Sequence, residues 1–248
     1  MTAAARNAGC DVVVIEALEN PLVRVLGPEL GEVFADLHRS HGVNLRTNAW
    51  VTSDDSHAGR AVVQLADGAD VQADLVVVGV GVTPNTALAD SAGLKVDNGI
   101  VVDELLRTSH PGLFAAGDVA NAHHRGLGRC LRVEHWDNAI AQGHAAARNM
   151  LGAGEPYERL PYFFTDQYDL GMEYVGSIGP EGYDEVVLRG DVQARVFTAF
   201  WLKNDTVLAG MHVNDWDAIE YIRQIVSAQK IDLTGLRDPG TPLDQLTG

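Results

Sequence analysis

The nine residues from Gly112 to Ala120, Gly-Leu-Phe-Ala-Ala-Gly-Asp-Val-Ala, constrain this chain more than any other segment. Small and apolar residues predict a buried strand that ends at Gly117, and Asp118 follows at once. A glycine at a strand end leaves no Cβ to block a ligand, and a carboxylate accepts hydrogen bonds from the hydroxyl groups of a sugar or ribityl chain. The segment therefore predicts either a ligand-binding strand end or a buried strand that closes in an ordinary Gly-Asp turn.

Composition excludes several classes of protein. The 248 residues can form one large or two modest domains, and their net charge of −16 argues against broad binding to nucleic acid or to anionic membranes. No apolar run reaches membrane-spanning length, and the N-terminus lacks a signal-peptide core. The two cysteines, Cys10 and Cys130, form no Cys-x-x-Cys. We therefore expect reduced, packed cysteines, no metal site and a cytoplasmic location.

The first residues have the pattern of the second half of a βαβ dinucleotide-binding unit. Thr2–Ala8 is typical of a helix end capped by Gly9, and Asp11–Ile15 is typical of a buried strand that ends at Glu16. In such a unit the acid binds the adenosine ribose hydroxyls and repels a 2′-phosphate, which favours NADH over NADPH. Glu16 equally fits a solvated acid at a strand end. The strand and Gly-x-Gly-x-x-Gly loop of the first half do not precede it in the sequence.

The next segment alternates predicted helices and strands. Pro28–Ser40 predicts an amphipathic helix, with His38 and His41 on its surface. Leu75–Val78 predicts a fully buried strand. It runs into Gly79-Val-Gly81-Val-Thr-Pro84-Asn85, where two residues without Cβ would let a flat ring or an amide approach the backbone. Two further strands are predicted at Val43–Trp50 and Ala61–Leu65.

The pattern changes at Gly152–Pro156, which we expect to be a domain boundary. Before it, the sequence predicts a short strand at Ile100–Val102, a polar loop at His123–Arg132 and a long helix at Val133–Leu151. After it come predicted strands, a hairpin turn and a helix: Glu173–Ile178, Glu185–Arg189, Val196–Lys203, the turn Asn204-Asp205, Val207–Val213 and the helix Asp215–Lys230.

Six short motifs follow one another in a set order. They are Val14-Ile-Glu16, Val78-Gly-Val-Gly-Val-Thr-Pro84-Asn85, Val96-Asp-Asn-Gly-Ile100, Leu113-Phe-Ala-Ala-Gly-Asp118, Val133-Glu-His-Trp136 with Asn138-Ala139, and Phe163-Phe-Thr-Asp-Gln-Tyr168. In this combination the chain resembles the flavoprotein NAD(P)H:ferredoxin reductases of the FAD-dependent pyridine-nucleotide oxidoreductase group. The type that serves bacterial cytochrome P450 and ring-hydroxylating dioxygenase systems is the most similar, and apoptosis-inducing factor is similar in layout.

The resemblance implies an α/β fold: a partial Rossmann-like NAD domain and a partial FAD domain, followed by an α+β C-terminal interface domain. We expect the NAD portion over residues 1–95, the second segment of the FAD domain over 96–153 and the interface domain over 154–248. The family's N-terminal FAD half and both glycine loops, which hold the cofactor pyrophosphates, are missing from the 248 residues. We therefore expect a C-terminal portion that binds flavin weakly and self-associates through its exposed sheet edge.

The resemblance also implies the residues that lie near the cofactors. Asp118 is expected to hold the ribityl chain, Trp136 to lie beside the isoalloxazine ring and Phe164 beside its exposed edge. Glu134 is the one catalytic candidate, near the nicotinamide, and equally fits an acid at a helix N-terminus. The aromatic residues also fit core packing. The expected cofactor-binding residues are Glu16, Gly79, Gly81, Pro84, Asn85, Gly117, Asp118, Glu134, His135, Trp136, Ala139 and Phe164.

The implied activity is transfer of electrons from NADH through FAD to a ferredoxin-type iron-sulfur protein. Arg125, Arg129 and Arg132 form a basic island that would steer an acidic ferredoxin, or a solvated loop of scattered charges. Two alternatives remain. One is a non-catalytic protein that binds little flavin. The other is a rubredoxin, nitrite or coenzyme A-disulfide reductase on the same scaffold, the last disfavoured because no suitably placed nucleophilic cysteine is present.

Overall fold

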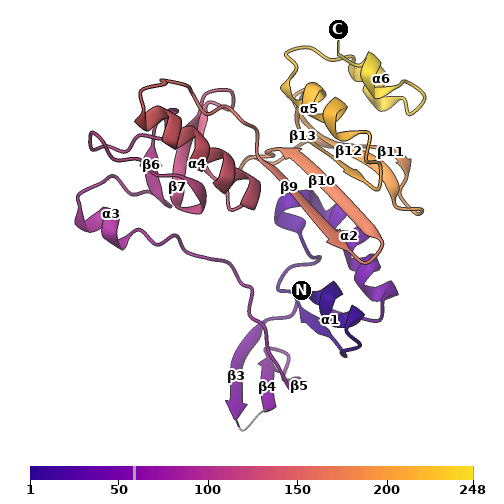
Figure 1. The fold of residues 1–248 in the computed structure, drawn as a ribbon. Helices are drawn as coiled ribbons and strands as arrows, with labels where there is room; N and C mark the ends of the chain where they lie inside the picture. The colour runs from indigo at the N-terminus through magenta and orange to yellow at the C-terminus, as the bar shows by residue number, and fades with distance from the viewer. Residues whose placement is uncertain (58–59, 248) are drawn as a thin grey trace. The chain divides into compact units, whose positions relative to one another are not determined.

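The computed structural model describes residues 1–57 and 60–247, which form two compact units (Figure 1). The first unit comprises Met1–Val80 together with Asp166–Leu170, and the second comprises Gly81–Thr165 and Gly171–Gly248. Each unit is described by itself.

The first unit contains a parallel βαβ arrangement followed by an antiparallel meander. Strands β1 and β2 pair in parallel, with Val13 opposite Asn44, and helix α2 connects them. Helix α2 kinks at Gly27, whose φ of 81° is non-helical, because Pro28 has no N–H to continue the helix. The elements are α1 (Thr2–Asn7), β1 (Val13–Ile15), α2 (Val23–Ser40), β2 (Asn44–Arg46), β3 (Val51–His57), β4 (Arg60–Leu65) and β5 (Asp70–Ala73).

The structure corrects two expectations in this unit. Leu75–Val78 is not a buried strand: the segment forms no strand, and Leu75 and Val78 are 78% and 69% exposed. A buried strand needs neighbours on both sides, and no strand among the described residues pairs with this segment. His38 is buried rather than superficial, and its Nδ1 lies 3.3 Å from the hydroxyl of Tyr168. Burial lowers the pKa of His38, with a further contribution from nearby His41.

The second unit begins with a small three-stranded sheet. β6 and β7 are parallel, β7 and β8 are antiparallel, and the order is β6-β7-β8. Its core includes Val102, Leu106 and Ala120, and Ala145 and Ala146 of the long helix α4 pack against them. The elements are α3 (Ala87–Ser91), β6 (Ile100–Val102), the 3₁₀ turn η1 (Gly117–Val119), β7 (Ala120–His124), β8 (Arg129–Arg132) and α4 (Trp136–Met150).

Two local predictions fail around this sheet. The predicted strand at 112–117 does not form: no strand leads directly into Gly117, which begins a 3₁₀ turn, and the strand β7 follows that turn. The predicted loop His123–Arg132 is instead a hairpin, with His123 opposite Cys130. The polar residues of 123–132 pair with one another across the hairpin, and the apolar residues before Gly117 make only the isolated bridge of Phe114 with Arg107, so composition alone misjudged both segments.

A five-stranded sheet completes the second unit, in the order β11-β12-β13-β10-β9. Asn204 and Asp205 both have positive φ, 47° and 60°, so the predicted hairpin turn is confirmed. Helix α5 lies over the sheet, where its Ile222 packs with Phe200 and Val175 (Figure 1). The elements are β9 (Tyr162–Gln167), β10 (Leu170–Gly176), β11 (Glu185–Asp191), β12 (Val196–Lys203), β13 (Thr206–Val213), α5 (Ile219–Ser227), α6 (Leu233–Arg237) and the 3₁₀ turn η2 (Leu243–Gln245).

The close contact of α5 with the sheet gives a stability prediction. A Cβ added to Gly210 would lie 2.7 Å from Cγ2 of Ile222 and 2.9 Å from the Phe200 ring. Gly210→Ala should therefore lower the free energy of unfolding by about 1–3 kcal/mol through overpacking, measured by chemical denaturation. Gly143→Ala is the control. It lies in α4 with nothing within 4 Å of its added Cβ, and should stabilise the protein by about 0.5–1 kcal/mol. Equal stability of Gly210→Ala and the parent would contradict this packing.

Three exposed apolar residues, Leu75, Val77 and Val78, give a second prediction, while Val76 between them packs on a buried cluster. Contiguous exposed apolar residues promote association and bind apolar dyes. We expect the 248-residue chain to enhance anilinonaphthalene sulfonate fluorescence and to associate with rising concentration in analytical ultracentrifugation. Val78→Lys should reduce both signals without changing the circular dichroism spectrum, whereas Asp74→Lys, beside the run, should not. A chain that stays monomeric and leaves the dye dark would count against this expectation.

Candidate functional site

The Gly-Asp turn lies against helix α4. Gly117 has a φ of +79°, a conformation that favours glycine. The position that a Cβ would occupy is 3.4 Å from Cβ of Ala139, so the turn and the first turns of α4 are in close contact. Asp118 is exposed. The turn therefore presents a solvent-facing carboxylate at a point where the backbone has no side chain in front of it.

The N-terminus of α4 provides backbone donors beside this turn. His135 is the N-cap residue, and no side chain among the described residues caps the helix. The first N–H groups of a helix have no partner within it, and they attract anionic groups. Asp137 in the first turn is engaged elsewhere, because its Oδ1 is 2.7 Å from Nη2 of Arg159. The helix end is thus open to a ligand.

Glu134 and Arg132 form an ion pair just before the helix. The side chain of Arg132 is largely buried, and its Nη1 also donates to the backbone oxygen of Asp118 at 3.2 Å. The guanidinium therefore connects Glu134 to the Gly-Asp turn. Glu134, the candidate near the nicotinamide, is held in place by a cation rather than free in solvent.

Aromatic side chains surround the helix N-terminus in two different ways. The His135 ring stacks on Phe163 at 4.8 Å, and Phe163 stacks on Tyr174 at 4.6 Å. Burial lowers the pKa of His135, although Asp118 and other nearby carboxylates oppose the shift, so the ring is neutral at pH 7. Trp136 and Phe164 differ, because they are 74% and 50% exposed. Phe163 thus belongs to a packed stack, whereas Trp136 and Phe164 offer free aromatic surface.

The remaining predicted cofactor residues lie elsewhere. Gly81, Pro84 and Asn85 belong to the irregular segment before α3, and nothing lies within 4 Å of a Cβ added to Gly81. Gly79 lies in the first unit and is equally open. The structure therefore brings together Gly117, Asp118, Glu134, His135 and Ala139, and leaves the segment from residue 79 to 85 as exposed backbone.

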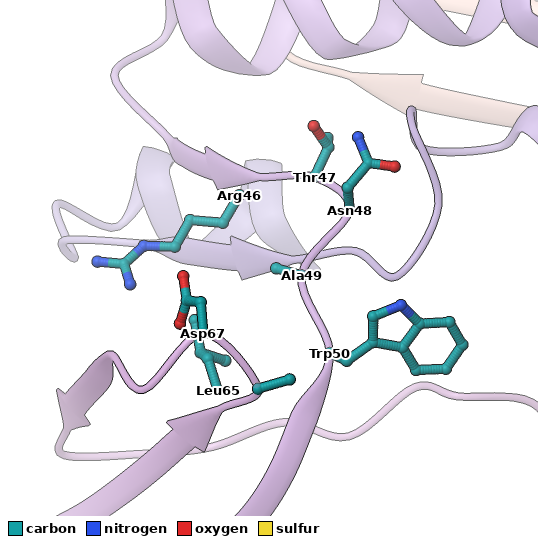
Figure 2. Close-up of a pocket in the computed structure, with 8 residues that line it drawn as sticks. Arg46, Thr47, Asn48, Ala49, Trp50, Leu65 and Asp67 are labelled. Atoms are coloured by element: carbon teal, nitrogen blue, oxygen red, sulfur yellow. The ribbon is translucent and has the colours of Figure 1, made fainter.

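Glu16 follows strand β1 in the first unit. Its Oε1 accepts a hydrogen bond from Leu18 N at 2.9 Å, which closes the turn after the strand. Its backbone oxygen accepts from Ala49 N at 3.0 Å, at the edge of a hollow of about 230 Å³. Figure 2 shows the Arg46 and Asp67 side chains on one side of this hollow and Trp50 on the other. The hollow is lined by Arg46, Thr47, Asn48, Ala49, Trp50, Leu65, Ala66 and Asp67.

The three arginines of the predicted docking island all have partners in the second unit. Arg125 Nε lies 3.6 Å from Glu158, and Arg129 Nη2 donates to Ser177 Oγ at 2.5 Å. Arg132 pairs with Glu134. Arg125 is the most exposed of the three, with a side chain that is 56% accessible. The charge available to a partner is therefore smaller than the sequence suggests.

One expectation about reactive groups needs revision. Cys10 and Cys130 are both exposed rather than packed. Within residues 1–57 and 60–247, no three His, Cys, Asp or Glu side chains lie close enough to hold a metal ion. No helix in the same described residues is both long and apolar enough to cross a membrane.

Sequence reasoning missed a set of buried polar residues under the site. Asn138 and Gln142 of α4 are almost fully buried, and Tyr157 donates its hydroxyl to Asn138 Oδ1 at 3.0 Å. Burial raises the pKa of Tyr157 to about 12, so this hydroxyl keeps its proton at neutral pH. Their signal was present in the sequence, because residues 138 and 142 are one helical turn apart and lie on one face.

The parallel βαβ unit, the glycine-acid turn at a helix N-terminus and the appended five-stranded sheet define a mixed α/β protein. The family model "Pyridine nucleotide-disulphide oxidoreductase" matches residues 1–143, and the model "Reductase C-terminal" matches residues 162–247. The chain belongs to the pyridine nucleotide-disulphide oxidoreductase family. The family resemblance and the mixed α/β fold class predicted from the motifs are confirmed.

Curated relatives and solved structures agree with this assignment. The ferredoxin reductase subunit of 5,5'-dehydrodivanillate O-demethylase from Sphingobium sp. (strain NBRC 103272 / SYK-6) is 39% identical over 243 residues, which is 96% of this chain and 58% of that protein. Putidaredoxin reductase CamA of Pseudomonas putida is 35% identical, covering 99% and 59%. The crystal structure of the ferredoxin reductase for the CYP199A2 system from Rhodopseudomonas palustris has a TM-score of 0.92 at 35% identity, covering 98% and 60%. The chain thus spans about three fifths of these proteins' length.

Proposed function

We propose that this chain forms the later part of an NADH-dependent, FAD-containing reductase that passes electrons to a ferredoxin-type iron-sulfur protein in the cytoplasm. The observation that carries the proposal is the Gly117–Asp118 turn, packed against α4, whose first residue Trp136 is exposed. The relatives named as ferredoxin reductases support the activity and the partner, and the structure of a putidaredoxin reductase–putidaredoxin complex, 34% identical with a TM-score of 0.89, gives the same support.

The residues of the second unit fit FAD. Exposed Asp118 is an acceptor for ribityl hydroxyl groups, and the uncapped N-terminus of α4 supplies N–H donors. Trp136 and Phe164 offer flat apolar surface that would shield the isoalloxazine ring from water. FAD, when bound, supplies hydride acceptance and single-electron release. The protein's part is to bind and orient, with Glu134 held by Arg132 on the side proposed for the nicotinamide.

The first unit fits the proposed NADH site. Glu16 follows a strand in parallel pairing, where an acid binds adenosine ribose hydroxyls, and Gly79, Gly81, Pro84 and Asn85 leave open backbone for the nicotinamide end. We propose the corresponding domain assignment: an NAD portion at 1–95, a second FAD segment at 96–153 and an interface domain at 154–248. Arg125, Arg129 and Arg132 remain the proposed ferredoxin-steering residues, with exposed Arg125 contributing most.

The flavin site can be tested on the chain as it stands. We expect weak FAD binding, seen as partial quenching of flavin fluorescence on titration. Asp118→Asn should weaken it about tenfold, because a hydrogen bond to a charged acceptor is lost. Asp90→Asn, an exposed acid in α3, is the matched control and should bind as the parent does.

Two results would speak against this reading. Equal FAD affinity in Asp118→Asn and the parent would remove Asp118 from the site. A parent chain that shows no quenching at any FAD concentration, and no ferredoxin reduction when FAD and NADH are supplied, would favour the alternative of a non-catalytic interaction protein.

The coenzyme preference depends on Glu16. We expect the parent chain to bind NADH more tightly than NADPH in isothermal titration calorimetry, because the carboxylate repels the 2′-phosphate. Glu16→Gln keeps an acceptor for Leu18 N. It should reduce the ratio of NADH affinity to NADPH affinity about tenfold, which corresponds to the free energy of one charge-assisted hydrogen bond. Glu19→Gln, an exposed acid after the same strand, should change neither affinity. A parent that binds both coenzymes equally would refute the assigned preference.

A further inference from the structure

Helix α4 has an unusual distribution of polarity. Its buried face carries three amide side chains, Asn138, Gln142 and Asn149, which are 4%, 2% and 8% exposed. Its outward face carries Trp136 and Ile140, both exposed. Burial of an amide costs free energy unless the group is hydrogen-bonded, so a helix that needed only to be packed would place apolar residues there. The amides therefore need an explanation beyond core formation.

Each amide bonds to a different segment of the chain. Gln142 Oε1 accepts from Gly117 N at 2.8 Å, in a buried contact. Asn138 Nδ2 donates to Val133 O at 3.0 Å, in the connection that leads to Glu134 and His135. Asn149 Nδ2 donates to Leu105 O at 3.1 Å and to Glu155 O at 2.9 Å, at the far end of the helix. The two amides near the N-terminus thus hold the two segments that carry the candidate flavin residues.

The Gln142 contact determines the position of the Gly-Asp turn. Gly117 is buried and has a positive φ. The N–H of the peptide that leads into the turn therefore needs a hydrogen-bond partner from another part of the chain. Ala139, one helical turn before Gln142, packs on the same glycine. The turn is thereby fixed by one polar and one apolar contact from α4. These contacts determine the position of Asp118, the next residue in the chain.

We infer that Gln142 is a positioning residue for the flavin site: its amide holds the Gly117 peptide so that Asp118 faces the ribityl chain, while Asn138 does the same for the segment 133–135. The inference rests on the proposed function, since Asp118 is the residue assigned to FAD. Gln142 itself acts through Gly117 and does not contact the cofactor.

The test compares two substitutions at one position. Gln142→Met has similar length and no strong acceptor, and Gln142→Glu keeps an oxygen that accepts from Gly117 N. The space near Asn138, Gln142 and Tyr157 is only about 10 Å³, too little to admit more than one water. Truncation of Gln142 to alanine would create a cavity as well as remove the hydrogen bond, so the two effects could not be separated. Asn149→Leu is the matched control, because it removes a buried amide from the other end of the same helix face.

The primary measurement is hydrogen exchange of the Gly117 amide by NMR in the full 248-residue chain without flavin. Gln142→Met should speed this exchange about tenfold relative to the parent, the effect of losing one typical hydrogen bond. Gln142→Glu should retain the protection, and Asn149→Leu should lower the thermal midpoint without selectively exposing Gly117. In FAD titrations, Gln142→Met should bind FAD more weakly than the parent, as Asp118→Asn should. Gln142→Glu should have an FAD affinity closer to that of the parent.

The outcomes separate this inference from the proposed function. Parent-like protection of Gly117 in Gln142→Met would overturn the positioning role, whatever the flavin result. Fast exchange with unchanged FAD affinity would also overturn it, because the turn would then not matter to the ligand. The positioning role would be established if Gln142→Met shows both fast Gly117 exchange and weakened FAD binding, while Asn149→Leu keeps the parent's Gly117 exchange and FAD affinity. Failure of ferredoxin reduction alone would count against the proposed electron transfer, not against Gln142.

Discussion

The candidate site depends on one buried interaction, the packing of the Gly117 turn against helix α4. Gly117 brings no Cβ to the contact, so Ala139 approaches within 3.4 Å of where one would lie, and Gln142 accepts the Gly117 N–H at 2.8 Å. These contacts set where Asp118 emerges and how it faces the uncapped helix N-terminus. The ion pair of Arg132 with Glu134, and the bond from Arg132 to Asp118 O, connect the segment 132–134 to the same turn.

Helix α4 and the segment Leu75–Val78 share one feature: both carry apolar side chains that are exposed to solvent. The inward face of α4 combines Ala145 and Ala146, which pack in the core, with three buried amides that bond to backbone, and the outward face carries exposed Trp136 and Ile140. Leu75 and Val78 are likewise apolar and exposed. Apolar surface in such places is favourable only when something covers it. The proposed flavin would cover part of the surface near Trp136, which links the chemistry of the site to the stability of the unit around it.

Local signals predicted some elements well. The hairpin at Asn204-Asp205 and the long helix ending near Leu151 could be predicted from turn residues or periodicity, because these elements form from neighbours in sequence. The strand Ile100–Val102 was also predicted, from its β-branched residues, although it pairs with residues 120–122. Predictions failed where residue composition did not reflect the local backbone pairing. The segment before Gly117 has strand-like composition without a strand, and His123–Arg132 is polar yet forms a hairpin. Leu75–Val78 has the composition of a buried strand but no described neighbour to pair with.

The sequence by itself determined the family, the α/β class and the chemical types at the site: a glycine, an acid, a glutamate and aromatic residues in a recognisable order. Residue identity is enough for this, because the motifs are defined by residue types in a fixed order along the chain. Only the tertiary structure decided which charges stay free. It paired Arg125, Arg129 and Arg132 with nearby partners, and it brought Gln142 to Gly117 across 25 residues of chain. Such contacts depend on distance in space, which periodicity and motifs do not encode.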